Sequence, residues 1–258
     1  MSDHGWNKYD YGGRYFDLWC VLPLSLDPMA EKFPWLSPYA LFNNNPTLYV
    51  DPDGRFTMAT HSKMVATAFS STRLNTQTIN NIKMGASLTA DLANMKNSAV
   101  HMDGMKGTKS IGEGYVRALY NFATQMKDGN YEMAGVALHT VADFYSHSNY
   151  ISLYQQYATD NNLSMDINDI PTFSEAVQNT DLMNYIENNG GLETGTYGGL
   201  VQDMTTNDPK AHGNMNLDEN KGKGANPYNE NNPKGATMHD AAKAVAEREL
   251  KKIAENYK

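Results

Sequence analysis

Residues 137–149 constrain the chain most, because they combine an apolar helical pattern with three ionisable side chains. On an α-helix, residues four positions apart differ by only about 40° around the axis, so His139, Asp143 and His147 share one face. Their neighbours, such as Phe144, are bulky and apolar, which predicts a central and buried helix. Buried imidazole and carboxylate groups need partners, and a metal ion would supply one. The open alternative is a core helix whose histidines only form hydrogen bonds.

The length of this stripe indicates how many ions it would hold. At about 1.5 Å per residue, His139 and His147 lie roughly 12 Å apart along the axis. A single zinc ion, with ligands at about 2.0–2.2 Å, cannot reach both. If all three side chains bind metal, at least two ions are expected, and Asp143 in the middle is the natural bridging carboxylate.

The composition restricts which residues could complete such a site. The chain has 258 residues, seven histidines and one cysteine, Cys20, which excludes an intramolecular disulfide and a cysteine-based zinc cluster. Metal must therefore be held by histidines and carboxylates. The other candidates, each weak alone, lie near predicted helix starts, in helices or in a polar loop: His61, Asp91, His101, His212, Asp218 and His239.

Charge and hydropathy exclude several classes of protein. With 21 Lys+Arg against 29 Asp+Glu the net charge is −8, so the chain shows no basic footprint for duplex nucleic acid. No apolar run reaches the roughly 18 residues of a membrane-spanning helix. The N-terminus has no Sec-type signal pattern.

A change in composition and residue pattern along the sequence predicts two parts. Residues 1–56 are rich in proline and aromatic residues and favour short strands and turns. Residues 57–258 show alanine, methionine and leucine at helical spacing, which predicts an all-α domain. The expected helices are 58–71, 76–97, 111–127, 131–157, 172–188 and 236–256. Residues 205–235 form a long polar loop of the kind that is usually functional or disordered.

The first part resembles the conserved end of the Rhs-repeat core, through residues 9–17 (YDYGGRYFD), 27–34 (DPMAEKFP) and 51–54 (DPDG). In that family a β-cage encloses a variable C-terminal toxin, which would begin here at about Phe56. The positions that match its self-cleavage aspartates are Asp27 and Asp51. The resemblance implies delivery by a type VI secretion apparatus into a target bacterium, and a cognate immunity protein as partner.

The second part resembles the zinc-dependent phospholipase C and single-strand nuclease superfamily, over residues 57–256. The run at residues 143–149 (DFYSHSN) looks specifically like the Het-C branch. The resemblance implies an all-helical fold, preceded here by the irregular or β Rhs-core arm, with two or three zinc ions at the bottom of a cleft.

Carried over to this chain, the resemblance implies a distribution of ligands. Asp91, His101, His139 and Asp143 would hold one zinc ion, with Asp91 either a ligand or the catalytic base. Asp143 would bridge to a second ion, which His61 also serves. The third ion would be held by His147 with one or more of His212, Asp218 and His239, a choice that the sequence leaves open.

The function expected from these patterns is a secreted antibacterial toxin, a zinc-dependent phosphodiesterase of the phospholipase C type. It would bind a membrane surface and hydrolyse phospholipid head groups. One alternative is a single-strand nuclease on the same metal cluster. Another is a non-catalytic, membrane-permeabilising or partner-binding module in which zinc only holds helices together.

Overall fold

The chain divides into two compact units, Met1–Ala59 and Thr60–Lys258. In the first unit, three short strands form an antiparallel sheet in the order β1 (Lys8–Asp10), β2 (Tyr15–Asp17) and β3 (Leu22–Pro23). The predictions for Asp27, Asp51 and Phe56 fall outside the described residues. The computed structural model describes residues 8–10, 15–17, 22–23, 26, 59–94, 97–196, 217, 225–229 and 235–258.

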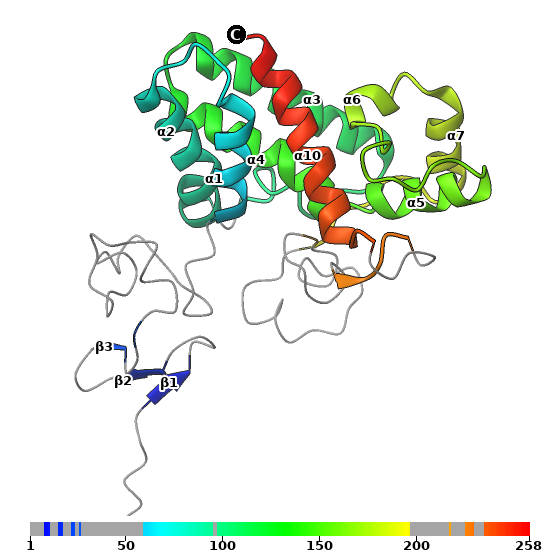
Figure 1. Ribbon diagram of the computed structural model, residues 1–258, viewed down its shortest axis with the longest axis horizontal. Coiled ribbons are helices and arrows are strands. Elements are labelled where there is room, and N and C mark those ends of the chain that lie inside the picture. The colour runs from blue at the N-terminus through cyan, green and yellow to red at the C-terminus, as the bar shows by residue number, and fades with distance from the viewer. Residues whose placement is uncertain are drawn as a thin grey trace, which may run out of the picture. The chain divides into compact units, whose positions relative to one another are not determined.

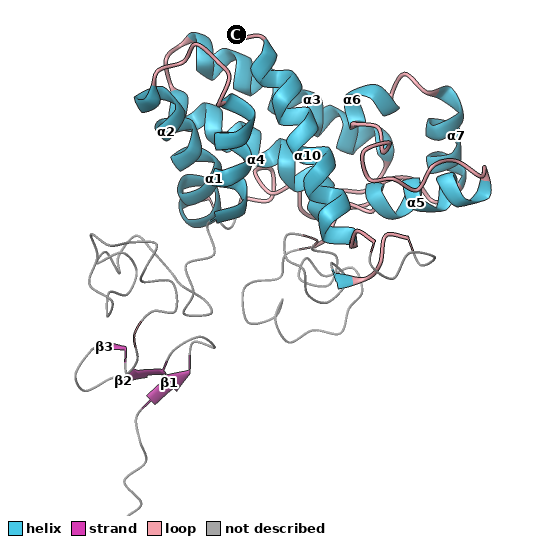
Figure 2. Ribbon diagram, viewed as in Figure 1, coloured by secondary structure: helices cyan, strands magenta, loops and turns pink. Residues whose placement is uncertain are grey.

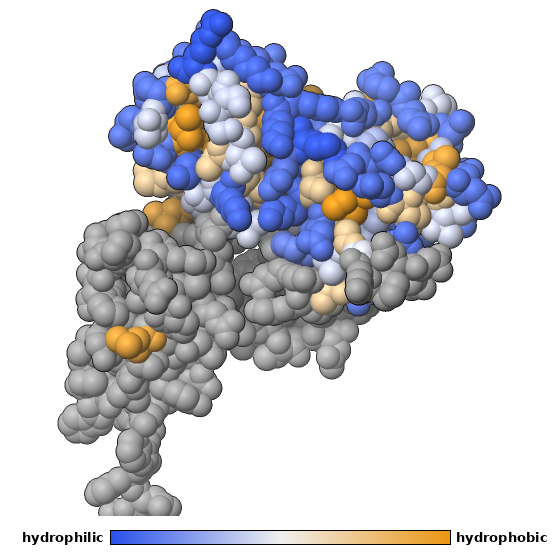
Figure 3. All heavy atoms as spheres, in the orientation of Figure 1, coloured by the Kyte–Doolittle hydropathy of each residue, from blue (hydrophilic) through white to orange (hydrophobic). Residues whose placement is uncertain are grey.

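The second unit is helical, as the periodicity from Thr57 predicts, and its described part consists of helices and connecting loops (Figures 1 and 2). None of the described helices is long and apolar enough to cross a membrane. On the face shown in Figure 3, hydrophilic side chains dominate the described surface and apolar ones form separate spots. The elements are α1 (Ala59–Phe69), α2 (Thr76–Met84), the π-helix η3 (Gly85–Ala93), α3 (Thr108–Lys127), α4 (Tyr131–His147), α5 (Tyr150–Asp160), α6 (Phe173–Ala176), α7 (Thr180–Asn188) and α10 (Met238–Glu255).

Helix α4 is the central element of this unit. Every residue from Ala134 to His147 is buried, because the helix is covered by α2, η3, α3 and α10 (Figure 1). A helix that is apolar around its whole circumference is expected to lie inside a protein. His139, Asp143 and His147 therefore lie in the interior, where solvent cannot satisfy them.

The prediction of one helix over 131–157 is wrong, because the chain breaks between α4 and α5. Ser148 has extended backbone angles (φ −98°, ψ 167°), and its Oγ accepts a hydrogen bond from the Tyr150 amide. Asn149 exchanges hydrogen bonds with Glu193, its amide donating to the Glu193 carbonyl and its Oδ1 accepting from the Glu193 amide. The bonds to Glu193 come from a segment distant in sequence. The break leaves His147 in the last turn of α4.

The predicted helix 172–188 is also two helices, α6 and α7. The Asn179 side chain between them accepts a hydrogen bond from the Leu182 amide and so begins α7 as an N-cap. Asparagine is one of the favoured residues at this position.

The predicted helix 76–97 changes from α to π geometry at Gly85, where two glycines allow close contact with α4. A Cβ atom on Gly85 would lie 1.8 Å from the Glu132 carbonyl oxygen, and one on Gly135 would lie 2.0 Å from the Ile82 carbonyl oxygen. Any larger residue at either position would separate the two elements. The glycine pair therefore sets the distance between η3 and α4.

Candidate metal centre

Asp143 is the centre of a cluster of four histidines, and its side chain is 0% exposed. Its Oδ1 lies 3.1 Å from His61 Nε2. Its Oδ2 lies 2.8 Å from His139 Nε2, 3.1 Å from His101 Nδ1 and 3.6 Å from His147 Nδ1. The two carboxylate oxygens thus face different sets of imidazoles.

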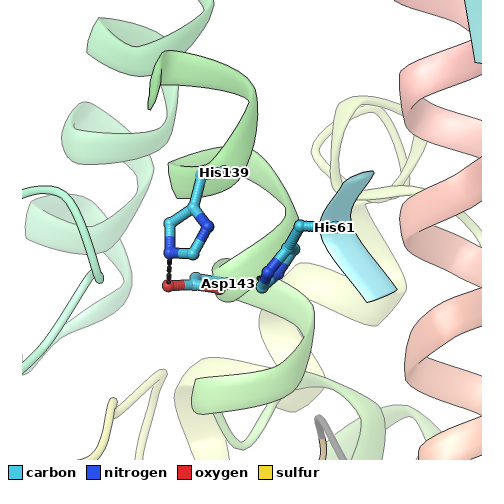
Figure 4. A group of neighbouring side chains, drawn as sticks. All are labelled: His61, His139 and Asp143. Carbon is cyan, nitrogen blue, oxygen red and sulfur yellow. Dashed lines mark ion pairs between the residues drawn. The ribbon is translucent and has the colours of Figure 1, made fainter. Parts of the chain in front are cut away.

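Three segments of the chain build this cluster. Helix α4 supplies His139, Asp143 and His147, and the i, i+4 spacing places both histidines near the same oxygen of Asp143. His61 comes from the first turn of α1, and Figure 4 shows both His61 and His139 directed toward Asp143; the centroids of the two rings lie 4.2 Å apart. His101 comes from the loop between η3 and α3.

The hydrogen bonds of His139 determine which ring nitrogen could bind metal. Its Nδ1 lies 3.0 Å from the Ala86 carbonyl oxygen, which can only accept, so Nδ1 carries a proton. Its Nε2 faces Asp143 Oδ2 at 2.8 Å, His101 Nδ1 at 3.1 Å and Asp91 Oδ1 at 3.5 Å. Lone pairs that converge in this way repel one another unless a proton or a metal cation lies between them. A metal ion would satisfy all four atoms together.

Residues of the π-helix η3 contact both ring nitrogens of His139. Ala86 contacts Nδ1 of His139 and Asp91 contacts Nε2, and these two residues of η3 are five positions apart. On an α-helix five residues turn through about 140° beyond a full turn, so the two would face apart. In a π-helix the hydrogen bond joins residues i and i+5, which places them about one turn apart on the same side.

The distances fit a metal site. Two ligands of a tetrahedral zinc ion lie roughly 3.3–3.6 Å apart, given metal–ligand bonds of about 2.0–2.2 Å. Potential ligand atoms fall within 4.8 Å of one another in two groups, His61–His139–Asp143 and Asp91–His101–His139. Because only Nε2 of His139 is available, His139 can serve one ion, whereas the two oxygens of Asp143 can serve two. The buried cluster could therefore hold metal ions.

Electrostatics keep the centre charged in the metal-free protein. Burial would raise the pKa of the Asp143 carboxyl, but the charges of His139 and His147 and hydrogen bonds from His101 and His139 hold it well below its usual range. Burial would lower the pKa of His101, but its hydrogen bond with Asp143 and the charge of that carboxylate raise it. His101 Nε2 is buried and has no hydrogen-bond partner among the described residues. The atoms of the site that a metal ion could use are those that face one another, among them His101 Nδ1, His139 Nε2 and Asp143 Oδ2.

Of the three further predicted ligands, the structure describes His239, and no contact among the described residues joins it to Asp143. His239 lies in the first turn of α10, and its Nδ1 donates to the Leu217 carbonyl oxygen at 2.7 Å. It lines a small cavity together with His61, between α1, α4 and α10. His212 and Asp218 lie outside the residues that the structure describes.

Asp103 is a member of the cluster that the sequence did not single out. Its side chain is 4% exposed, and its Oδ1 lies 3.8 Å from His147 Nδ1. The sequence feature that could have identified Asp103 is its position two residues after His101 and directly before Gly104, because glycine often marks a turn.

Comparison of the chain with protein-family models, with curated proteins and with solved structures found no match. The resemblances to the Rhs core and to the phospholipase C superfamily accordingly stay predictions from sequence motifs. The function of the centre has to be inferred from its geometry and chemistry.

Proposed function

We propose that the chain is a zinc-dependent phosphodiesterase of the phospholipase C type, which releases the head groups of phospholipids. The observation that carries the proposal is the division of the two Asp143 oxygens between two sets of histidines. A carboxylate in this position can bridge two ions a few Å apart, as two-metal phosphoester hydrolases require. A ligand set of imidazoles with carboxylates suits zinc better than calcium or magnesium, which prefer oxygen ligands alone.

The described residues divide naturally between ions. His101 and His139 would hold one ion with Asp143 Oδ2, with Asp91 beside them, and His61 would hold a neighbouring ion with Asp143 Oδ1. Zinc in such a site supplies positive charge for the phosphodiester oxygens and lowers the pKa of a water molecule.

Asp91 is the strongest candidate for proton transfer. Its side chain is 36% exposed, whereas the side chains of Asp143 and Asp103 are 0% and 4% exposed. A general base must reach the attacking water, so it has to lie on the open side of the centre. We assign Asp91 to orient that water and to accept its proton, while buried Asp143 remains an ionised ligand.

Phospholipid is proposed as substrate rather than single-stranded nucleic acid. The net charge of −8 gives the chain no general attraction for a polyanion. A phospholipid head group offers the same phosphodiester to the metal centre at a membrane surface.

The biological setting is proposed from the motifs at residues 9–54. We propose that residues 1–56 end an Rhs cage, that a type VI secretion apparatus delivers the helical domain into a target cell, and that an immunity protein blocks the site. We also propose a third zinc ion, which His147 would bind together with one or more of His212, Asp218 and His239.

The test is hydrolysis by the purified full chain with defined metal content. Vesicles of phosphatidylcholine, vesicles of phosphatidylethanolamine and single-stranded DNA are incubated in parallel, before chelation, after chelation and after zinc is restored. We expect release of phosphorylated head groups that chelation abolishes and zinc restores. His139→Ala and Asp143→Ala should lose this activity, whereas Asp128→Asn, at an exposed carboxylate outside the centre, should keep it.

Each contrary result identifies what is wrong. Full activity of folded Asp143→Ala would contradict the metal centre as the catalytic site. Cleavage of DNA without release of head groups would replace the lipid substrate by the nuclease alternative. Tight zinc binding with vesicle leakage and no hydrolysis of either substrate would indicate the non-catalytic alternative.

A further inference from the structure

A pocket of about 730 Å³ lies between α3, α6 and α7, and its lining residues include none of the candidate metal ligands. Its walls are apolar: Val116 and Leu119 of α3, Phe173 of α6, Val177 directly after α6, and Met183 of α7. Val116 and Val177 are 63% and 46% exposed, so these walls are open to a ligand. Clefts of about 300–1,000 Å³ with mostly apolar walls and a few polar groups are typical of small-molecule sites.

Ser174 of α6 also lines this pocket, and its hydroxyl is bonded to a buried carboxylate. Glu249 of α10 is 2% exposed, and its Oε1 accepts the Ser174 hydroxyl proton at 2.5 Å. This length is typical of a hydrogen bond from a hydroxyl to an ionised carboxylate. A hydroxyl has one proton, so any further bond of Ser174 Oγ must be one that it accepts. Ser174 therefore offers an acceptor to a ligand, and the carboxylate behind it strengthens that acceptor.

No described ion pair joins Glu249 to a lysine, arginine or histidine. Its second oxygen, Oε2, accepts from the Tyr145 hydroxyl at 3.5 Å. The neighbouring cations of α10 bond elsewhere, because Lys252 pairs with Glu175 and Arg248 donates to backbone carbonyls. A charge in the protein interior is screened far less than one in water, so the field of this carboxylate reaches the pocket.

The other charges around the pocket have the same sign on balance. The charged side chains that line it are Glu113, Glu187 and Lys109, all exposed, so carboxylates outnumber ammonium groups. Burial holds the pKa of the Tyr115 hydroxyl, which also lines the pocket, well above its usual range, and the charge of Glu249 raises it further. This tyrosine thus adds no charge of its own. The pocket combines apolar walls with an acceptor in a negative field.

We propose that this pocket binds a small apolar amine, whose ammonium group donates to Ser174 Oγ and whose carbon chain lies against the apolar walls. Glu249 favours such a cation over a neutral or anionic molecule of the same shape, because it acts through the hydroxyl that the ligand contacts. The site is independent of the proposed function, since none of its residues is a candidate metal ligand.

The first experiment titrates the full chain with three probes that share an eight-carbon chain and differ in the polar group: octylamine, octanol and octanoate. Near neutral pH the amine is protonated and the acid is ionised. We expect octylamine to bind about 5–10-fold more tightly than octanol, because hydrogen bonds from charged donors contribute more than those from neutral ones. Octanoate should bind most weakly. Isothermal titration calorimetry measures the three dissociation constants.

The second experiment locates the bound probe. Amide NMR spectra of the full chain are recorded during the octylamine titration. We expect the Gly112 and Val177 resonances to shift with the calorimetric dissociation constant, because both residues line the pocket. The Leu163 resonance should stay in place, since this exposed residue is not part of the lining.

Glu249→Gln tests the buried charge, because it keeps the shape of the side chain. The ratio of the octanol and octylamine dissociation constants should fall from about 5–10 to within about 2-fold. A ratio is the informative quantity, since a loss of folded protein would weaken the binding of both probes equally. An unchanged ratio in the folded variant would overturn the role of Glu249.

A pair of exposed substitutions tests the same field without touching the interior. Val177→Lys should weaken the binding of octylamine about 2-fold and Val177→Glu should strengthen it about 2-fold, as for other exposed charge pairs. Leu163→Lys, which adds the same charge at an exposed leucine outside the pocket, is the matched control and should bind as wild type. Equal affinities of the two Val177 variants would overturn the electrostatic preference.

The probe series gives clear contrary results. Octylamine that binds no more tightly than octanol would overturn the proposal, because the pocket would then be only an apolar groove. Octanoate as the tightest probe would also overturn it, since Lys109 would then select the ligand. Absence of saturable binding, or binding that leaves the Gly112 and Val177 resonances in place, would do the same. A chain that binds octylamine as expected but releases no head groups would contradict the proposed function alone.

Discussion

At Asp143, complete burial and a negative charge occur together because imidazoles surround the carboxylate. Oxygen Oδ2 alone lies within 3.6 Å of nitrogens of three histidines, and Oδ1 faces the fourth. Breaking a buried ion pair by removing one member is costly, because the remaining charge is left without compensation. The cluster is therefore expected to matter for stability even without metal.

Asp143→Asn should lower the free energy of unfolding of the chelated protein by about 3 kcal/mol. The amide has the shape of the carboxylate but cannot balance protonated imidazoles. Urea denaturation in excess chelator measures the change, with Asp128→Asn as control. A midpoint equal to that of the wild type would contradict the charged state assigned to the cluster.

Tyr145, next to the metal-binding face of α4, belongs to a different network. Its side chain is fully buried, and its hydroxyl accepts the Phe173 amide hydrogen at 2.9 Å and lies 3.2 Å from the Tyr115 hydroxyl. No described hydrogen bond joins this hydroxyl to a histidine. The network connects α4 to α6 and α3 rather than to the metal centre.

Tyr145→Phe should therefore destabilise the protein by about 1–3 kcal/mol, because the buried Phe173 amide loses its acceptor. Zinc affinity should stay at the wild-type value. Denaturation and zinc titration of the same preparation test both halves of the prediction, and Tyr120→Phe, at a side chain that is 70% exposed, is the control. Weakened zinc binding would show that the two networks are coupled.

The sequence predicted those site residues whose neighbours are local. The spacing of His139, Asp143 and His147 determines which of them share a helix face, whatever the rest of the fold does. Asp103 was missed because its approach to His147 depends on a left-handed turn at Met102 and on packing against a distant helix. No periodicity in the sequence reports such a turn.

Among the elements, the positions of helices followed from periodicity, but their interruptions did not. The break after His147 depends on hydrogen bonds between Asn149 and Glu193, which lie 44 residues apart. The change from α2 to η3 depends on contact between Gly85 and α4. Hydrophobic spacing indicates which face of a segment is buried. It therefore predicts neither the break after His147 nor the change from α-helix to π-helix at Gly85.

Gly135→Ala should damage fold and site together. The new Cβ would lie 2.0 Å from the Ile82 carbonyl oxygen of α2 and 2.7 Å from the Ala86 amide nitrogen of η3, so both elements would have to move away from α4, which would withdraw the Ala86 carbonyl from His139. We expect a loss of about 1–3 kcal/mol in stability, as for other overpacked cores, together with weaker zinc binding. Thermal unfolding with and without zinc measures the two effects.

Gly112→Ala is the matched control, because it places the same methyl group in the interior of α3. There the nearest atoms to a new Cβ are carbons of the Phe173 ring at 3.9 and 4.0 Å. Alanine is favoured over glycine inside helices, so the variant should be neutral or more stable by up to about 1 kcal/mol. If both variants behaved alike, the close contact between η3 and α4 would not control the site.

For the whole molecule, the metal centre makes stability depend on pH. The His101–Asp143 pair stabilises the metal-free protein more at lower pH, whereas zinc stabilises the protein more at higher pH. The pKa of His101 is raised by Asp143, so in the metal-free protein this pair stabilises the fold fully below the unfolded pKa of about 6.5 and loses that contribution as pH rises through the folded pKa. The pKa of Asp143 is lowered, so its contribution is present above the unfolded value near 3.9 and is lost at more acidic pH. Zinc reverses the first trend, because its ligands must be deprotonated to bind.

The increase in melting temperature produced by zinc should therefore grow steadily from pH 5 to pH 8. Protons compete with zinc for the imidazoles at the acidic end, whereas at the basic end the metal-free protein has also lost the His101–Asp143 contribution. Scanning calorimetry of chelated and zinc-saturated protein at each pH gives the difference directly, and His139→Ala should flatten it. A zinc-induced increase that was independent of pH would mean that the histidines around Asp143 are not the ligands, since binding through them has to release protons or exclude them.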